Sequence, residues 1–398
     1  MLLSFLFCVT TVQAITTIEI GQLAVERSAS LRAEEMEARA LGFDANTKSK
    51  WQNPQLMGQF GNLKSGNVSG ATAEVSFTQP IPLSNKLTLR RELAEAAMTA
   101  QHEHAQYFKK WIQHQAQLSA WNLIIAQELF SHGIERAKRL GLVKKYMETR
   151  PRVSPRQRVE LSLVASTLLQ LERMQDERAH ALKLAKSDLE FWTGKVIDPE
   201  EIELKIPETP QLIIIDDARI DQDPELKTAR RSLEMATLDK EMAQKDRRPD
   251  LFVGAGYRLE DVTPVNHFSY GIVGLNIPLW DTGTDKVEAA GARLIRDQRR
   301  LTEISRRVEL RHMQQAEAVR FAMDQLKRFP KRFIATSESA IQEAERGFKQ
   351  GLLDVNTFLQ TETQSHEVID QVVLAWGAYL ENVSAWQLMR GEEFQWNP

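Results

Sequence analysis

The pattern of apolar and polar positions is helical over two long parts of the chain. The first runs from Leu83 to Arg150 without a proline, and the second begins at Leu279. At about 1.5 Å per residue, an unbroken first helix would extend roughly 100 Å. A helix of this length must pack along other long helices, because no small globular core can cover it. Gly133 and Pro330 weaken the two helices at nearly equivalent places, so we expect a bend or a break in both.

Short segments with a two-residue period precede each long helix. They predict strands at Gln55–Asn62 and Thr72–Thr78 in the first half and, somewhat longer, at Asp250–Arg258 and Ser269–Ile277 in the second. This alternation suits a half-buried soluble sheet and also the wall of an outer-membrane barrel, and both interpretations stay open here. Four strands cannot close a barrel, so the second interpretation requires several chains to pool their strands. The candidate lipid-facing residues are Ala73, Val75, Phe77, Leu251, Val253, Tyr257 and Ile272.

Each long helix is expected to reverse direction at a tight turn. The first turn is predicted at residues 150–155, where Ser154 followed by Pro155 is a typical helix start. The second is predicted at residues 350–354, where Asp354 could cap the returning helix.

The two halves repeat one plan. Pro54 and Pro249 lie 195 residues apart, and the phrase Ile81-Pro82-Leu83 recurs 196 residues later as Ile277-Pro278-Leu279. Gly194, a plausible helix terminator, has a counterpart 197 residues on in Gly391. Such spacing indicates a duplication, so the halves should be structural equivalents. Each reads as helix, strand, loop, strand, long helix, turn, long helix, and the opening helix of the first half is expected from Ala24 to Lys50. The predicted divisions are a first repeat at 15–194, a linker at 195–223, a second repeat at 224–391 and a short tail at 392–398.

Residues 1–14 are predicted to be a signal peptide. Leu2–Val12 is mostly apolar, and Val12-Gln13-Ala14 fits a small-residue cleavage site. The usual basic residue after the first methionine is missing, and a buried N-terminal helix is the alternative. Cys8 is the only cysteine, so a processed chain would have neither disulfides nor cysteine-based metal sites. Lipidation of Cys8 is not expected, because Phe7 before it is too bulky for a lipid-attachment signal.

Composition and motifs argue against several classes of protein. The formal net charge of −3 gives no electrostatic reason to expect nucleic-acid binding. After the first residues, no stretch approaches the roughly 18–20 apolar residues of a transmembrane helix. The chain carries no glycine-rich phosphate loop, zinc-type His-Glu-x-x-His motif or nucleophile elbow. We therefore expect a structural conduit without catalytic activity, cofactor or bound metal.

In the order and spacing of these features, the sequence resembles the TolC-like outer-membrane efflux family. The features that carry the resemblance are the duplication, the Asn53-Pro54 and Arg248-Pro249 strand openings, the Ile-Pro-Leu phrases, the Gly351-Leu352-Leu353 turn, and the Thr193-Gly194 and Arg390-Gly391 helix endings. The resemblance implies a mainly α-helical protein with a small β part. In the implied homotrimer, long α-hairpins form a periplasmic α-barrel, and each chain contributes four strands to a twelve-stranded barrel in outer-membrane lipid. It also implies a periplasmic adaptor (membrane fusion) protein and an inner-membrane pump of the RND type. The short tail and linker look most like the cobalt-zinc-cadmium cation-efflux branch.

The turns are where the chain departs from the family pattern. The family often has acids one and two turns into the helix after the second turn, where they form an electronegative constriction. Counted from Gly351, these positions hold Thr357 and Gln360 here. The candidate constriction residues are Asp354, Glu160, Thr357 and Gln360, with a plain helix cap as the alternative role for Asp354. The candidate adaptor-docking residues are Arg150, Pro151, Arg152, Val153, Ser154, Gln350, Gly351 and Leu352.

The leading hypothesis is thus a passive export duct of a tripartite efflux system for metal cations or small toxic compounds. Two alternatives are the outer-membrane duct of a type I protein secretion system and a soluble coiled-coil scaffold.

Overall fold

The computed structural model describes residues 14–65, 68–149, 154–207, 215, 219–261, 263–277, 279–329 and 333–394. Apart from Ala14, the predicted signal peptide lies outside these residues, as do Arg150, Pro151, Arg152 and Val153. The chain divides into two compact units. Unit 1 comprises residues 1–31, 107–223 and 309–398, and unit 2 comprises residues 32–106 and 224–308.

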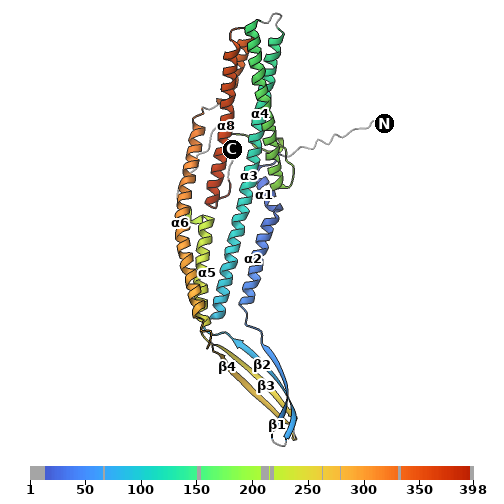
Figure 1. Ribbon diagram of the computed structural model, residues 1–398, viewed down its shortest axis with the longest axis vertical. Coiled ribbons are helices and arrows are strands. Elements are labelled where there is room, and N and C mark those ends of the chain that lie inside the picture. Colours follow the sequence, from blue (N-terminus) through green and yellow to red (C-terminus); the bar gives the residue numbers. More distant parts are fainter. Residues whose placement is uncertain are drawn as a thin grey trace, which may run out of the picture. The chain divides into compact units, whose positions relative to one another are not determined.

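Unit 2 contains one antiparallel sheet, whose four strands lie side by side in the order β1-β2-β3-β4 (Figure 1). The strands are β1 (Gln55–Ser65), β2 (Val68–Ile81), β3 (Asp250–Asp261) and β4 (Asn266–Asn276). The helices of this unit are most of α2 (Ala29–Lys48), α5 (Pro224–Asp246), and the first parts of α3 (Lys86–Glu148) and α6 (Thr284–Lys327). Each half of the chain thus contributes one hairpin to the sheet, as the duplication predicts.

The first hairpin is longer than its sequence pattern indicates. β1 and β2 have 11 and 14 residues, against 12 and 11 for β3 and β4, so the expectation of a shorter first pair is wrong. The ladder continues through polar and glycine positions, where Leu63 pairs with Gly70 and Lys64 with Ser69. Backbone hydrogen bonds do not depend on side-chain polarity. The pairing of β1 with β2 therefore extends beyond the segment in which apolar and polar residues alternate.

Lys86, the first residue of α3, fastens that helix to the start of β3. Its side chain is 3% exposed, and its ammonium lies 2.9 Å from Asp250 Oδ1 and donates to the carbonyl of Arg248 at 2.7 Å. Asp250 Oδ1 also accepts from the backbone N–H of Leu83 at 3.1 Å. A buried charge is tolerated only when paired in this way, so these contacts fix where the sheet meets the helix.

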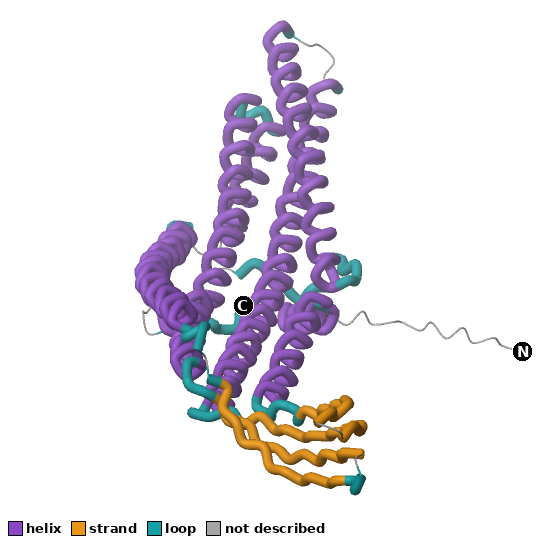
Figure 2. Tube along the Cα trace, turned by 60° about the horizontal axis from the view of Figure 1, so that its bottom comes forward, coloured by secondary structure: helices purple, strands orange, loops and turns teal. Residues whose placement is uncertain are grey.

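Unit 1 is helical. Its elements are α1 (Thr17–Arg27), α4 (Pro155–Thr193), α7 (Phe333–Lys349), α8 (Val355–Met389), the later parts of α3 and α6, and the short 3₁₀ turns η1 (Pro199–Glu201) and η2 (Ile220–Gln222). α4 runs back alongside α3 (Figure 2), and α8 packs against α7. One buried cluster joins all four of these helices, through residues that include Val143, Val164, Phe348 and Phe358. The two helical hairpins therefore share a core next to their turns.

The opening helix of the first half differs from the predicted Ala24–Lys50. It consists of α1 and α2, which are separated at Ser28, the C-cap of α1. The Ser28 hydroxyl accepts from the backbone N–H of Leu31 at 3.0 Å and so caps the start of α2. Serine competes for backbone hydrogen bonds in this way, and that explains the break.

Gly133 does not interrupt α3, which continues through it, whereas α6 ends at Lys327 and α7 begins at Phe333. The expected interruption is therefore found only in the second copy, and Pro330 itself lies outside the described residues. In α3, a Cβ at Gly133 would lie 2.1 Å from Gln175 Oε1 of α4. The Gln175 amide donates to the carbonyl of Phe130 at 3.1 Å. The glycine thus allows α4 to approach the backbone of α3.

Candidate channel-forming surfaces

The strand register gives the sheet one strongly apolar face. Because paired residues share a face, Val75 with Tyr257 and Val253 with Val273 lie on the same side. Of the seven residues predicted to face lipid, six share this side: Ala73, Val75, Phe77, Leu251, Val253 and Tyr257. Phe60, which pairs with Ala73, joins them and is 84% exposed, and Val273 is 78% exposed. In the described chain, this apolar face is largely open to its surroundings.

Ile272 does not belong to that face. It pairs with Gly254, whereas its neighbour Val273 pairs with Val253. Ile272 and Val273 are adjacent and both apolar, so the sequence of β4 fits either phase. The register that the hairpin adopts turns Val273 outward with Val253, and the prediction for Ile272 is corrected accordingly.

The opposite face is polar at its centre. Glu74 on β2 lies directly across from Arg258 on β3, and the Arg258 guanidinium lies 2.7 Å from Glu74 Oε2. Tyr270 on β4 donates its hydroxyl to the other oxygen of the same carboxylate. We call this face, which also carries Ser76 and Ile272, the polar face.

The sheet is open at both sides. Within the part of the chain that the structure describes, β1 pairs only with β2, and β4 only with β3. The outer edges of β1 and β4 therefore present backbone donors and acceptors that can pair with another strand.

In unit 1, the second helical turn is organised by Asp354, the N-cap of α8. Its carboxylate accepts from the backbone N–H of Thr357 at 2.8 Å, and this hydrogen bond lowers the pKa of Asp354. The charge of Arg156 on α4 lowers it further, and Arg156 also lies 2.9 Å from Glu160. The Arg156 guanidinium thus interacts with both Asp354 and Glu160, which were predicted from different copies of the repeat. Thr357 and Gln360 are exposed on α8.

Of the residues predicted to dock an adaptor, the described ones lie at the two turns: Ser154, Gln350, Gly351 and Leu352. Gln350 and Gly351 follow α7, Gly351 has a φ of 76°, and the Leu352 side chain is 75% exposed. Ser154 caps α4, as predicted, and it also forms a reciprocal capping box with Gln157.

Several solved structures similar to this chain are described as outer-membrane or transmembrane channels. The open-state MtrE outer membrane channel of Neisseria gonorrhoeae matches with a TM-score of 0.75 at 13% identity, over 95% of this chain and 89% of that one. The Campylobacter jejuni CmeC outer membrane channel matches with a TM-score of 0.70 at 12% identity, over 96% and 87%. CusC, studied for its folding and transmembrane channel formation, matches with a TM-score of 0.73 at 14% identity, over 94% and 92%. No protein-family model and no curated protein matches the sequence.

The chain has the fold of these outer-membrane channels. The likeness covers both halves of the duplication, strands and helices together, as the sequence predicted.

Within this channel fold, a buried polar layer in unit 1 was not anticipated from the sequence. Arg136 on α3 donates from Nε to Glu362 Oε1 at 2.9 Å and from Nη2 to Glu362 Oε2 at 3.0 Å, and Glu362 on α8 is fully buried. Burial raises the pKa of Glu362, and the hydrogen bonds from Arg136 oppose that effect. His366, one turn further, lies 3.4 Å from Arg139. Arg136 and Glu362 are 226 positions apart in the sequence, and only the packing of α3 against α8 brings them together.

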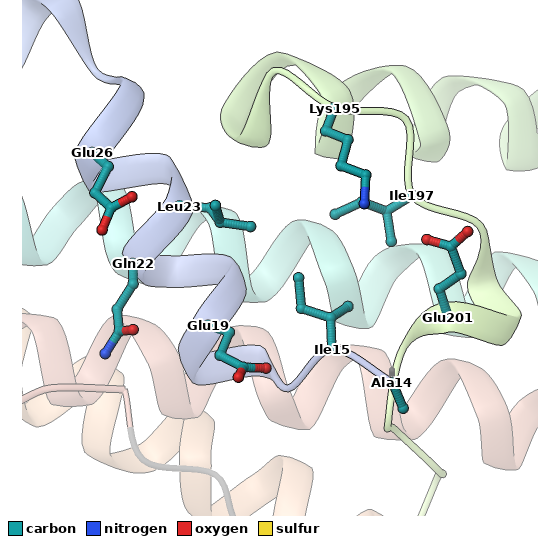
Figure 3. A pocket seen from close by; sticks show the side chains of 9 residues that line it. All are labelled: Ala14, Ile15, Glu19, Gln22, Leu23, Glu26, Lys195, Ile197 and Glu201. Carbon is teal, nitrogen blue, oxygen red and sulfur yellow. The ribbon is translucent and has the colours of Figure 1, made fainter. Parts of the chain in front are cut away.

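A solvent-open pocket of about 350 Å³ lies beside the start of α1 (Figure 3). Three carboxylates, those of Glu19, Glu26 and Glu201, line it together with Lys195. Glu19 completes the capping box of α1, and the backbone N–H of Thr16 donates to it at 2.8 Å, which lowers its pKa. The best-defined acid in this pocket therefore has a structural role in starting the helix.

Among the described residues, no group of three or more His, Cys, Asp or Glu side chains is placed to hold a metal ion. Their helices likewise include none that is both long and apolar enough to span a membrane.

Proposed function

We propose that three copies of this chain form a passive export duct, the outer-membrane component of a tripartite efflux system that extends into the periplasm. The observation that carries the proposal is the apolar face of the sheet, which is exposed across all four strands although its opposite face is polar. In water, an apolar patch of this kind favours aggregation, whereas outer-membrane lipid would cover it. The fold shared with known outer-membrane channels supports the same function.

Three copies are what the resemblance to the TolC-like family implies, and the open edges of the sheet are compatible with that number. If β1 of one copy pairs with β4 of the next, three sheets of four strands close into a twelve-stranded barrel without free edges. The apolar face would then contact lipid, and the polar face would line the lumen.

The helices of unit 1 would form the wall of an α-barrel in the periplasm, and the turns would be its docking end. The exposed Leu352 together with Ser154, Gln350 and Gly351 offers a mixed apolar and polar contact for a periplasmic adaptor protein coupled to an inner-membrane pump of the RND type. The pump would supply the energy, so the duct needs no reaction of its own.

The proposed cargo is metal cations or small toxic compounds. Deletion of the gene should lower tolerance to cobalt, zinc or cadmium salts if the duct belongs to a cation-efflux system. Unchanged tolerance to all three metals would leave small organic compounds as the cargo class.

Cysteine cross-linking in outer membranes tests the assembly, because Cys8 in the predicted signal peptide is the only native cysteine. Gln59→Cys on β1 is combined in turn with Phe268→Cys and Ile272→Cys on β4, since all three positions share the polar face. Copies joined edge to edge should give disulfide-linked trimers for at least one pair.

Phe60→Cys, one residue along on the apolar face, is the matched control and should not cross-link to either β4 cysteine. A protein that stays monomeric in the soluble fraction, with no cross-link from any pair, would refute the duct and favour a scaffold.

A further inference from the structure

The polar face of the sheet carries one charged cluster that bridges three strands. Glu74 on β2, Arg258 on β3 and Tyr270 on β4 meet there through side-chain hydrogen bonds. We propose that this cluster is the charge-selectivity element of the duct, in which Arg258 faces the passing solute and favours anions, while Glu74 is held back. The inference rests on the proposed function, because the polar face lines a lumen only in the assembled barrel. Of the two proposed cargo classes it favours small toxic compounds, since exposed guanidinium groups would repel metal cations.

The hydrogen bonds occupy both oxygens of the Glu74 carboxylate. Arg258 donates from Nε to Oε2 at 2.9 Å, with its Nη2 2.7 Å from the same atom, and the Tyr270 hydroxyl donates to Oε1. A carboxylate with two such donors is held in one orientation and has little capacity left to bind a passing cation.

The side chains of Glu74 and Arg258 differ in their exposure to solvent. The Glu74 side chain is 16% exposed, whereas that of Arg258 is 48% exposed. The guanidinium keeps donors beyond those used by Glu74, since it has five N–H groups. Positive charge is therefore presented to solvent, and negative charge is covered.

A glycine makes the arrangement possible. Gly256 on β3 lies directly across from Tyr270, and a Cβ at Gly256 would lie 2.2 Å from Tyr270 Cζ. The phenol ring thus crosses over β3 at this glycine to reach Glu74 on β2. Tyr270 is a positioning residue: it holds the carboxylate and leaves Arg258 outermost.

In a closed barrel of three copies, the cluster would recur three times at one height. Rings of charged side chains determine the ion preference of membrane pores, and lumen substitutions in outer-membrane barrels change selectivity. With Arg258 removed, the uncompensated Glu74 carboxylates would form an acidic ring instead. The preference is therefore sensitive to this pair, while Glu260 of β3 adds a further negative charge on the same face.

The test is the potassium-to-chloride permeability ratio of purified trimers in planar lipid bilayers, from reversal potentials in a KCl gradient. Arg258→Gln should raise the ratio roughly 25-fold, because a unit charge about 4 Å away in bulk water changes the local concentrations of potassium and chloride about fivefold each, in opposite directions. Glu74→Gln should lower it by a similar factor. Tyr270→Phe should raise it by less, although it changes no charge.

Matched controls lie on the apolar face. Lys64→Gln removes one positive charge and Asp261→Asn one negative charge, and both positions face away from the cluster. Neither should change the ratio, and Arg258→Lys should keep the native value.

The outcomes separate the two proposals. Trimers that insert but never conduct would refute the duct itself. Conducting trimers whose ratio is the same in the wild type, Arg258→Gln and Glu74→Gln would overturn the selectivity element and leave the duct intact. If one of these variants does not assemble, the other decides, because each predicts a shift of opposite sign.

Discussion

At the scale of single residues, His366 is the side chain with the most strongly altered chemistry in unit 1. It is 7% exposed, and burial together with the charges of Arg136 and Arg139 lowers its pKa to about 3. The imidazole is therefore neutral at physiological pH, although it lies 3.5 Å from the Glu362 carboxylate.

This environment predicts a loss of stability in acid. A histidine with a depressed pKa binds a proton in the unfolded chain near pH 6.5 but not in the folded chain until about pH 3. Its contribution is fully present above pH 6.5 and is lost as the pH falls toward 3. By pH 4 the cost is at most about 3 kcal/mol. His366→Gln should therefore lose less stability than the wild type between pH 7 and pH 4, as measured by thermal unfolding in detergent.

His180→Gln is the matched control, since His180 is an exposed histidine of α4. It should follow the wild-type profile. Parallel profiles for the wild type and His366→Gln would show that the buried imidazole is not the cause of the acid sensitivity.

At the scale of elements, Asp354 at the start of α8 could serve as a helix cap or as part of an electrostatic constriction, and substitutions distinguish the two roles. A cap needs an oxygen that accepts from the Thr357 N–H, which asparagine also supplies, whereas an electrostatic constriction needs the charge. We expect Asp354→Asn to retain both the stability and the conductance of the wild type. Asp354→Ala should lower the unfolding temperature by a few degrees. A change of conductance or cation preference in Asp354→Asn, without loss of stability, would assign the carboxylate to a constriction instead.

The elements also show what the sequence could predict. The caps at Ser154 and Asp354 and the helix endings at Gly194 and Gly391 depend on local chemistry, and the structure confirms them. The two hairpins and the long α3 likewise follow from period and spacing. Long-range packing decides the remainder. The role of Gly133 depends on Gln175 in another helix, and the buried Arg136–Glu362 pair joins residues 226 positions apart.

The phase of β4 is the clearest case of a choice that the sequence left open. Two neighbouring apolar residues, Ile272 and Val273, allow either face, and only the pairing with β3 distinguishes them. The alternating polarity of β2, with Glu74 and Ser76 between Ala73, Val75 and Phe77, carries no such ambiguity, and the three apolar residues share one side of the sheet.

At the scale of the whole assembly, these two neighbours provide a direct test of which face meets lipid. Val273→Lys would place an ammonium on the apolar face, where a lysine at the bilayer midplane of an outer-membrane barrel costs about 2–4 kcal/mol per chain. Ile272→Lys would place the same charge on the polar face, in contact with water of the lumen. The two variants add the same charge at neighbouring positions in the chain.

We therefore expect Ile272→Lys to assemble in the outer membrane at near wild-type levels, and Val273→Lys to be reduced severalfold, because three copies each bear the cost. The measurement is the amount of trimer in isolated outer membranes, compared with the total amount of each chain. Equal insertion of both variants would mean that Val273 is not in lipid. Preferential loss of Ile272→Lys would mean that the faces are reversed, so the Glu74–Arg258 pair could not line a lumen.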